Sequence, residues 1–141
     1  MDERSLISIY KESIEDILGN NNFIICNTDI GLDIKSNKLF NVGDVLYIPN
    51  KIIKIKNTDL IDKYGAYIWN DNYIISGFGM LLNNKDEKNS DNCIYNNITK
   101  SFVASKIILP GDSIRIDYKM NTNEYPPIPE EIIHLRSTMV V

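Results

Sequence analysis

The chain has 141 residues, of which 43% are hydrophobic and 24% charged, with a formal net charge of −4. This length and this balance are typical of one folded domain with a single core, and they argue against a disordered chain. The acidic balance also argues against a protein that binds nucleic acid through a basic face, and it suits a basic protein partner better.

Several chemistries lack the residues that they need. Cys26 and Cys93 lie far apart with no CxxC pair, and His134 is the single histidine, so a Cys/His zinc site is not expected. A Ser-His or Cys-His nucleophile would have to use His134, and the chain has no P-loop and no GxSxG motif.

The location is predicted from what the chain lacks. The N-terminus carries acidic charges and has no long apolar core, so a signal peptide is not expected. No apolar segment approaches the ~20 residues of a membrane span, so no membrane association is expected. We therefore expect an intracellular protein that is located in the cytoplasm or the nucleus, those of a host cell included.

The N-terminal segment predicts an amphipathic helix over residues 4–18. Leu6 and Ile14 belong to a set of apolar residues at helical spacing, Ser5 is a candidate N-cap, and Gly19 marks the end. The simplest role for this helix is packing on the rest of the domain. A lid or a helix that docks a partner is the alternative.

The next part of the chain predicts short elements separated by turns. Strands are expected at residues 23–26, 45–48 and 51–56. Residues 27–37 are expected to form a turn region with Gly31 at its centre. A short helical turn capped by Thr58 or Asp59 follows.

Residues 74–118 carry the most informative pattern. The apolar run IISGFGMLL is expected to be buried, and a polar loop rich in Asn separates it from two strands, NCIYNN and KSFVASKI. The segment SIRIDYKM alternates, which predicts a strand with Ile116 and Tyr118 on one face and Arg115 and Asp117 on the other. Many short strands with closely spaced turns and few helices indicate a mainly β (β+α) fold.

The order of these parts resembles the SET domain of protein lysine methyltransferases, in particular the small bacterial and viral members without zinc-binding flanks. That family has a buried apolar run that ends in Asn-His-Ser, an Asn shortly after it, and a strand that ends on a tyrosine. Here GFGMLLNN, Asn92 and SFVASKIILPGDSIRIDY follow in that order, with Phe102, Gly111 and Tyr118 in register. The resemblance covers residues 23–125 and is more specific in its C-terminal half.

The resemblance implies a SET-like fold of several short-stranded sheets with a knot-like C-terminal crossing. The amphipathic helix would be added at its N-terminus. We accordingly expect an N-terminal helical extension over residues 1–20, a SET-like domain over 21–125 and a C-terminal tail over 126–141.

The resemblance further implies S-adenosylmethionine as the cofactor. The residues expected to contact it are Ile30, Gly31, Leu32, Asp33, Asn83 and Asn84. Gly31 matches the first glycine of a GxG turn, where the backbone approaches the cofactor closely. Asn83 matches the Asn of Asn-His-Ser, whose amide can both donate and accept hydrogen bonds.

Tyr118 matches the catalytic tyrosine of the family, whose hydroxyl would position the substrate amine. Aromatic side chains in the middle of the chain are candidates for the channel of the substrate lysine, because ring faces attract cations. These candidates are Tyr67, Trp69 and Phe78. The alternative is that the aromatic side chains belong to the core.

Three residues depart from the family motifs. Asn84 replaces the His, Lys85 replaces the Ser, and Asp33 stands where the second glycine is expected. The carboxylate of Asp33 would intrude on the pocket and alter its charge, and it could pair with a cationic cofactor.

Two hypotheses follow. The first is an S-adenosylmethionine-dependent protein lysine N-methyltransferase that acts on a Lys-rich protein. The second is a catalytically degenerate SET-like module that binds a protein partner without methyl transfer. A basic protein or peptide is the expected partner, and a homodimer is an open alternative to the monomer.

Overall fold

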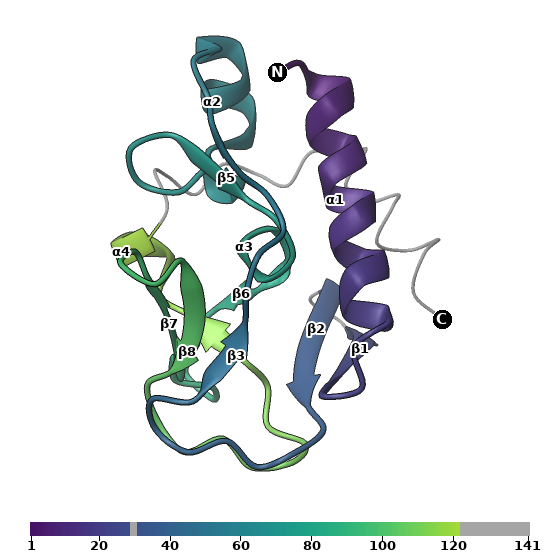
Figure 1. Cartoon of the computed structure of the whole chain (residues 1–141), viewed down its shortest axis with the longest axis vertical. Coiled ribbons are helices and arrows are strands. Elements are labelled where there is room, and N and C mark those ends of the chain that lie inside the picture. The colour runs from purple at the N-terminus through teal and green to yellow at the C-terminus, as the bar shows by residue number, and fades with distance from the viewer. Residues whose placement is uncertain (29–30, 122–141) are drawn as a thin grey trace.

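The structure is a computed structural model that describes residues 1–28 and 31–121 (Figure 1). Within these residues the helices are α1 (Glu3–Leu18), α2 (Thr58–Tyr64), α3 (Phe78–Leu81) and α4 (Tyr118–Asn121), with a 3-10 turn η1 at Gly65–Tyr67. The strands are β1 (Phe23–Thr28), β2 (Gly31–Ser36), β3 (Val45–Tyr47), β4 (Ile52–Lys54), β5 (Tyr73–Ile75), β6 (Asn83–Asn84), β7 (Cys93–Asn96), β8 (Ser101–Ala104) and β9 (Arg115–Ile116).

The described strands form several small sheets, as predicted, together with a few helices. β1 and β2 form an antiparallel hairpin, β3, β8 and β7 form a three-stranded sheet in that order, and β4 pairs with β5. The pair β6–β9 is parallel, and it joins two segments that are far apart in the chain. The knot-like crossing and the tail at residues 126–141 remain predictions, because residues 122–141 lie outside the described part.

The helix α1 lies along one side of the molecule and is part of its core (Figure 1). Its buried apolar side chains are Leu6, Ile9, Tyr10, Ile14 and Ile17. The N-cap is Asp2, whose carboxylate accepts a hydrogen bond from the Ser5 N–H at 2.8 Å. The prediction of Ser5 as the cap was wrong because an acidic residue stands three positions earlier, where it also favours the positive end of the helix dipole.

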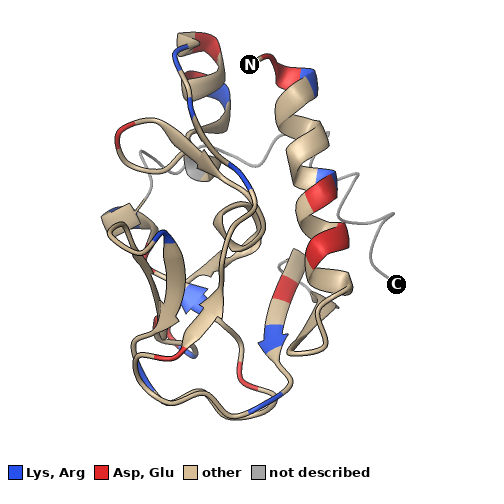
Figure 2. Cartoon of the chain, in the orientation of Figure 1, with Lys and Arg blue, Asp and Glu red and all other residues tan. Residues whose placement is uncertain are grey.

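Acidic side chains recur along the exposed part of α1 (Figure 2). Two of them form exposed ion pairs with other segments: Glu12 with Lys51 at 2.8 Å and Glu3 with Lys63 at 3.0 Å. Exposed pairs of this kind contribute little to stability. Burial of the apolar face is therefore what holds α1 in place.

The described residues between 27 and 37 form mostly strand, so the predicted turn region is corrected. β2 pairs with β1 from Thr28↔Gly31 to Phe23↔Ser36, and residues 29–30 between the two strands lie outside the described part. Gly31 has φ of 102°, a conformation that other residues rarely adopt. The sequence pattern did not predict β2, because a half-buried strand is recognised by alternating apolar and polar residues. In β2 the polar Asp33 is buried like both of its neighbours.

The cap of α2 is also corrected by one position. The side chain of Asn57 accepts hydrogen bonds from the N–H groups of Asp59 and Leu60, at 2.9 and 3.4 Å. Thr58 and Asp59 are instead the first residues of the helix. All three residue types favour caps, and only the backbone path decides which of them precedes the first turn.

The apolar run around α3 is buried, as predicted, and it is the centre of the aromatic core. Phe78 is 0% exposed and packs against Phe23, Tyr47 and Phe102, with ring centroids 4.9, 4.8 and 5.7 Å away. Such ring pairs add to the stabilisation that comes from buried area. Phe78 therefore anchors α3 between the β1–β2 hairpin and the three-stranded sheet.

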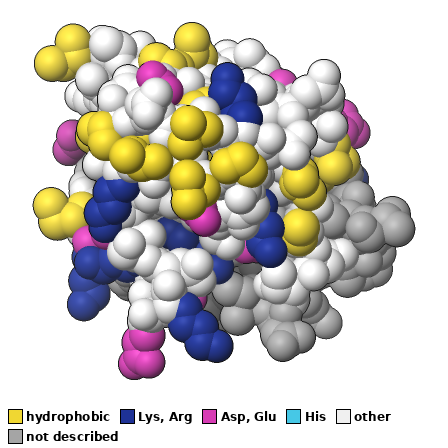
Figure 3. Space-filling model, turned by 90° about the horizontal axis from the view of Figure 1, so that it is seen from below, with side chains coloured by type: hydrophobic (Ala, Val, Ile, Leu, Met, Phe, Trp, Pro, Cys, Tyr) yellow, Lys and Arg dark blue, Asp and Glu magenta, His cyan; other side chains and the backbone are white. Residues whose placement is uncertain are grey.

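The outer side of the three-stranded sheet carries exposed apolar residues. Val45 and Ile94, 52% and 46% exposed, both pair with Val103 and therefore flank it across the sheet. A space-filling view from below shows hydrophobic side chains gathered in a band across that face of the molecule (Figure 3). In the described residues, no helix has both the length and the apolar character needed to cross a membrane.

The two thiols differ in burial, and this difference predicts their reactivity. Cys93 is buried in β7 and Cys26 is partly exposed in β1. Burial raises the pKa of the Cys93 thiol, so that its reactive thiolate form is suppressed. We expect iodoacetamide at pH 8 to modify Cys26 in the native protein and to leave Cys93 unmodified, as read by peptide mass spectrometry. Both should react in denaturant, and modification of Cys93 in the native state would contradict the structure.

Candidate functional site

The start of β2 supplies the first part of the candidate site. The side chain of Leu32 is buried in the core, while its carbonyl oxygen accepts a hydrogen bond from Asn83 Nδ2. Gly31 precedes it as the first residue of β2 and pairs with Thr28. Ile30, a predicted cofactor contact, lies outside the described residues. The structure thus places Asn83 in contact with the backbone of Leu32.

Asp33 forms an ion pair with Arg115 in the same chain. Its Oδ1 lies 3.4 Å from Arg115 Nη2, and the two side chains are only 4% and 5% exposed. Ser113 donates to Asp33 Oδ2 at 2.6 Å, and Asn83 Nδ2 lies 3.4 Å from Oδ1. The carboxylate thus has a cationic partner of its own, so its charge is compensated without a ligand.

Arg115 reaches this position because the segment before β9 pairs with β2. The Ile114 N–H donates to the carbonyl oxygen of Ile34 at 2.8 Å, and Lys35 is bridged to Ser113. The other terminal nitrogen of the guanidinium, Nη1, contacts both the Asn84 carbonyl oxygen at 3.1 Å and an Asp86 carboxylate oxygen at 3.3 Å. Its Nε is buried and has no hydrogen-bond partner in the described part of the chain.

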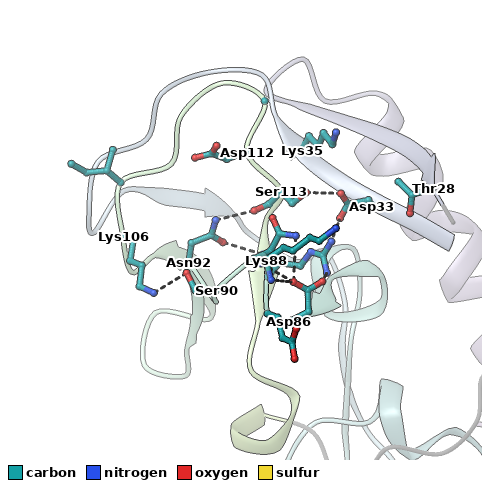
Figure 4. Close-up of a pocket in the computed structure, with 15 residues that line it drawn as sticks. Thr28, Asp33, Lys35, Asp86, Lys88, Ser90, Asn92, Lys106, Asp112 and Ser113 are labelled. Carbon is teal, nitrogen blue, oxygen red and sulfur yellow. Dashed lines mark hydrogen bonds and ion pairs between the residues drawn. The ribbon is translucent and has the colours of Figure 1, made fainter. Parts of the chain in front are cut away.

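Asn92 holds β9 in place next to this ion pair. Its Nδ2 donates to the Ser113 carbonyl oxygen at 2.9 Å, and its Oδ1 accepts from the Arg115 N–H at 3.0 Å. Figure 4 shows Ser113 between Asn92 and Asp33, with a bond to each. The Asn that follows the polar loop in the family motif therefore orients the strand that carries Arg115.

Asp86, in the polar loop, is a second carboxylate in contact with Arg115. Its carboxylate accepts from the N–H groups of Asn89 and Lys88, at 2.7 and 2.9 Å. These hydrogen bonds, first that from Asn89, lower the pKa of Asp86, and Arg115 adds to the effect. The turn that Asp86 begins fixes the polar loop against the site.

Tyr118 begins α4 and does not continue a strand. The alternation of SIRIDYKM predicts one strand, whereas β9 ends at Ile116. The turn is made by Asn84, whose Oδ1 accepts from the Tyr118 N–H at 2.8 Å. The Tyr118 hydroxyl donates to the carbonyl oxygen of Leu82, the residue before Asn83. The catalytic candidate thus contacts Asn84, one of the predicted cofactor residues, and the residue directly before Asn83.

The residues that replace the family motif make contacts within the chain. Asn84 binds the backbone of Tyr118, as described above, and Lys85 lies 3.2 Å from Asp117 in an ion pair. Both contacts tie the end of β6 to the start of α4. The altered motif therefore has a structural use at the same corner.

The three channel candidates lie in different surroundings. Phe78 is fully buried in the aromatic core, and Tyr67, 4% exposed, packs edge-on against Tyr10. Trp69 donates to the Gly79 carbonyl oxygen at 3.0 Å and lines a cleft of about 200 Å³. The other aromatic side chains of that cleft are Tyr73 and Tyr95.

Tyr95 is an aromatic candidate that the sequence analysis missed. Its ring lies 5.5 Å from that of Trp69 and 5.0 Å from that of Phe102, and burial raises the pKa of its hydroxyl. Its place in β7, directly after the polar loop, is the signal that could have indicated it. Arg115 was missed in a similar way, since a single arginine in an alternating apolar strand can be buried when it meets a carboxylate.

A larger cleft of about 930 Å³ opens beside the Asp33–Arg115 pair. It lies between β2, the polar loop that contains Asp86, and the segment before β9 (Figure 4). Charged side chains of both signs line it: Asp33, Lys35, Asp86, Glu87, Lys88, Lys106, Asp112 and Arg115. A polar cleft of this size can admit a charged small molecule.

Comparison with known proteins finds similarity in structure. No family model matches the chain, and no curated protein matches it in sequence. A chain of Plasmodium falciparum that is provisionally named a histone methyltransferase superposes with a TM-score of 0.50 at 19% identity, over 73% of this chain and 99% of that one. The CpSET8 protein of Cryptosporidium superposes with a TM-score of 0.52 at 22% identity, over 89% of this chain and 68% of that one.

At these identities the likeness shows the fold alone. The chain has a SET-like fold, which confirms the resemblance at that level. Because one fold can carry many functions, activity has to be argued from the residues of the site.

Proposed function

We propose that the chain is an S-adenosylmethionine-dependent protein lysine N-methyltransferase. One observation carries this proposal: the SET-like fold gathers Leu32, Asn83 and Tyr118 into one corner. Asn83 binds the backbone of Leu32, and the Tyr118 hydroxyl binds the residue before Asn83. This is the neighbourhood that the family resemblance implies for a cofactor and a catalytic tyrosine.

The groups at this corner fit the charges of the proposed cofactor. These groups are the guanidinium of Arg115, the carboxylate of Asp33 and the amide of Asn83. The guanidinium Nε is buried and lacks a hydrogen-bond partner in the described residues. Arg115 would hold a carboxylate, Asp33 an ammonium group, and Asn83 either one. The bound cofactor would supply a methyl group on a cationic sulfur for transfer to an amine.

Tyr118 would position the substrate amine. A hydroxyl that donates its hydrogen to the Leu82 carbonyl can act only as an acceptor toward an amine N–H. Such a bond turns the nitrogen lone pair away from the hydroxyl, and Leu82 fixes the direction in which the hydroxyl points. Positioning of this kind is a main source of rate in transfers between two bound groups.

Replacement of Tyr118 by Phe tests this role. We expect transfer of a radiolabelled methyl group to mixed histones, a lysine-rich test substrate, to fall at least about tenfold. Affinity for S-adenosylmethionine, measured by calorimetry, should stay within about twofold of the wild type. An unchanged transfer rate in a variant with a normal melting temperature would contradict the assignment.

A second candidate function is a SET-like module that binds a basic protein without methyl transfer. The observation that favours it is the set of bonds that Asp33, Asn83 and Arg115 make to one another and to the backbone. In that case the corner would be a closed structural network. The acidic residues along α1 would then offer a surface for the partner (Figure 2).

Titration with S-adenosylmethionine separates the two candidates. Binding that is lost in Asn83→Ala supports the methyltransferase. The absence of both heat and a thermal shift at millimolar cofactor would contradict the methyltransferase and leave the binding module as the better proposal.

A further inference from the structure

We propose that the buried Asp33–Arg115 pair is a subsite for the zwitterionic amino-acid group of an adenosyl ligand. Arg115 would bind the carboxylate of the ligand, and Asp33 would bind its ammonium group. This inference rests on the proposed function, because it assumes that the neighbouring cleft admits such a ligand. It adds Arg115, which lies outside the motifs expected to bind the cofactor, and gives Asp33 a defined partner group in the ligand.

The two residues differ from the other charged groups of the cleft by their burial. Asp33 and Arg115 are 3% and 4% exposed, whereas Lys88, Lys106 and Asp112 are exposed to solvent. Water and salt screen the exposed charges, and they screen buried charges much less. The charges of the buried pair are therefore the least screened ones that a ligand in the cleft can meet.

The bonds of Arg115 are incomplete without a ligand. Its guanidinium is spread over Asp33 at 3.4 Å, Asp86 at 3.3 Å and the Asn84 carbonyl at 3.1 Å. These distances exceed the 2.7–2.9 Å that is usual for a charge-assisted hydrogen bond. The Nε is buried with no partner among the described residues. An added carboxylate can therefore improve the contacts of Arg115, through a two-pronged bond that uses the Nε.

A zwitterion can enter this pair without leaving a buried charge unpaired. Its carboxylate replaces Asp33 at Arg115, and its ammonium group replaces Arg115 at Asp33. A ligand with a single charge would pair with only one of the two residues. The other residue would remain buried as an unpaired charge, which is energetically costly. The pair therefore selects for an amino-acid group over a lone carboxylate or a lone amine.

Both partners are held in place by groups that need not move. Ser113 donates to Asp33 at 2.6 Å, and Asn92 binds the backbone of both Ser113 and Arg115. A subsite whose charges are positioned in advance loses less free energy on binding than one that must be ordered by the ligand.

Calorimetric titration with two matched ligands tests the proposal. S-adenosylhomocysteine carries the amino-acid group, and 5′-deoxy-5′-methylthioadenosine is the same kind of nucleoside thioether without it. We expect the wild-type chain to bind the first at least tenfold more tightly. Asp33→Asn, which keeps the hydrogen-bonding shape, and Arg115→Lys, which keeps the charge, should each reduce this ratio at least fivefold, with affinity for the second ligand unchanged within twofold.

Lys106→Gln is the matched control. Lys106 lies at the rim of the same cleft and binds Ser90 at 3.1 Å, so its loss should leave the ratio unchanged. Equal binding of the two ligands by the wild type, or a ratio that survives in both folded variants, would overturn the subsite while the proposed function stands. Failure of the wild type to bind either ligand would overturn both. Melting curves identify a variant that does not fold, and in that case the binding ratio of the other variant tests the subsite.

Discussion

Gly77→Ala is expected to lower the free energy of unfolding by about 3 kcal/mol or more, through overpacking and backbone strain together. Gly77 has φ of 66°, which side chains disfavour, and an added Cβ would overlap the ring of Tyr47. Neither cost arises in the wild type because glycine has no Cβ.

Tyr47 has little room to move away from such a Cβ. Its ring is stacked on Phe78 at 4.8 Å, and its hydroxyl donates to the carboxylate of Asp16 in α1. The N–H of Gly77 donates to Ser13, also in α1, at 2.7 Å. The substitution would therefore disturb the place where α1 packs against the start of α3.

Urea unfolding measures this effect, and Gly43→Ala is the matched control. Gly43 also has a positive φ, of 89°, but nothing lies within 4 Å of its added Cβ. The control should cost about 1 to 2 kcal/mol from the backbone alone. Equal losses for the two variants would show that Tyr47 accommodates the methyl group, and the packing argument would then be wrong.

Arg115→Met is expected to destabilise the protein by about 3 to 5 kcal/mol, since it leaves Asp33 as a buried carboxylate without its cation. Asp33 and Arg115 are both almost fully buried, so water cannot replace the lost partner. The double variant Asp33→Leu with Arg115→Met should recover most of the loss, because apolar side chains of similar volume need no partner.

The same urea unfolding experiment, completed as a double-mutant cycle, measures the coupling between the two residues. Lys51→Met is the control for loss of an ordinary surface pair, because Lys51 and Glu12 are about half exposed. Its cost should stay below about 1 kcal/mol. A double variant as unstable as Arg115→Met would mean that the cost comes from lost packing and not from the unpaired charge.

The ion pair also explains how a residue that departs from the family motif can be accommodated. A glycine is expected where Asp33 stands, and a lone carboxylate in that position would be costly. Arg115, Ser113 and Asn83 compensate it together. Whether the network serves a ligand or only the fold is the question that the two adenosyl ligands decide.

The sequence by itself predicted the features that depend on local pattern. The spacing of Leu6 and Ile14 predicted the buried face of α1, and the unbroken apolar run predicted the burial of α3. The order of the motifs predicted a SET-like fold. Periodicity and motif order are properties of the chain itself, so they can be recognised before any contact is known.

Tertiary structure alone decided which polar groups are paired and where the side chains lie. Arg115 meets Asp33 because the segment before β9 pairs with β2, and Asn84 ends the alternating strand by binding Tyr118. Phe78, a channel candidate, lies in the core because three other rings surround it. Such contacts join residues far apart in the chain. Their energies depend on burial and on the neighbours that the fold supplies, and local periodicity encodes neither.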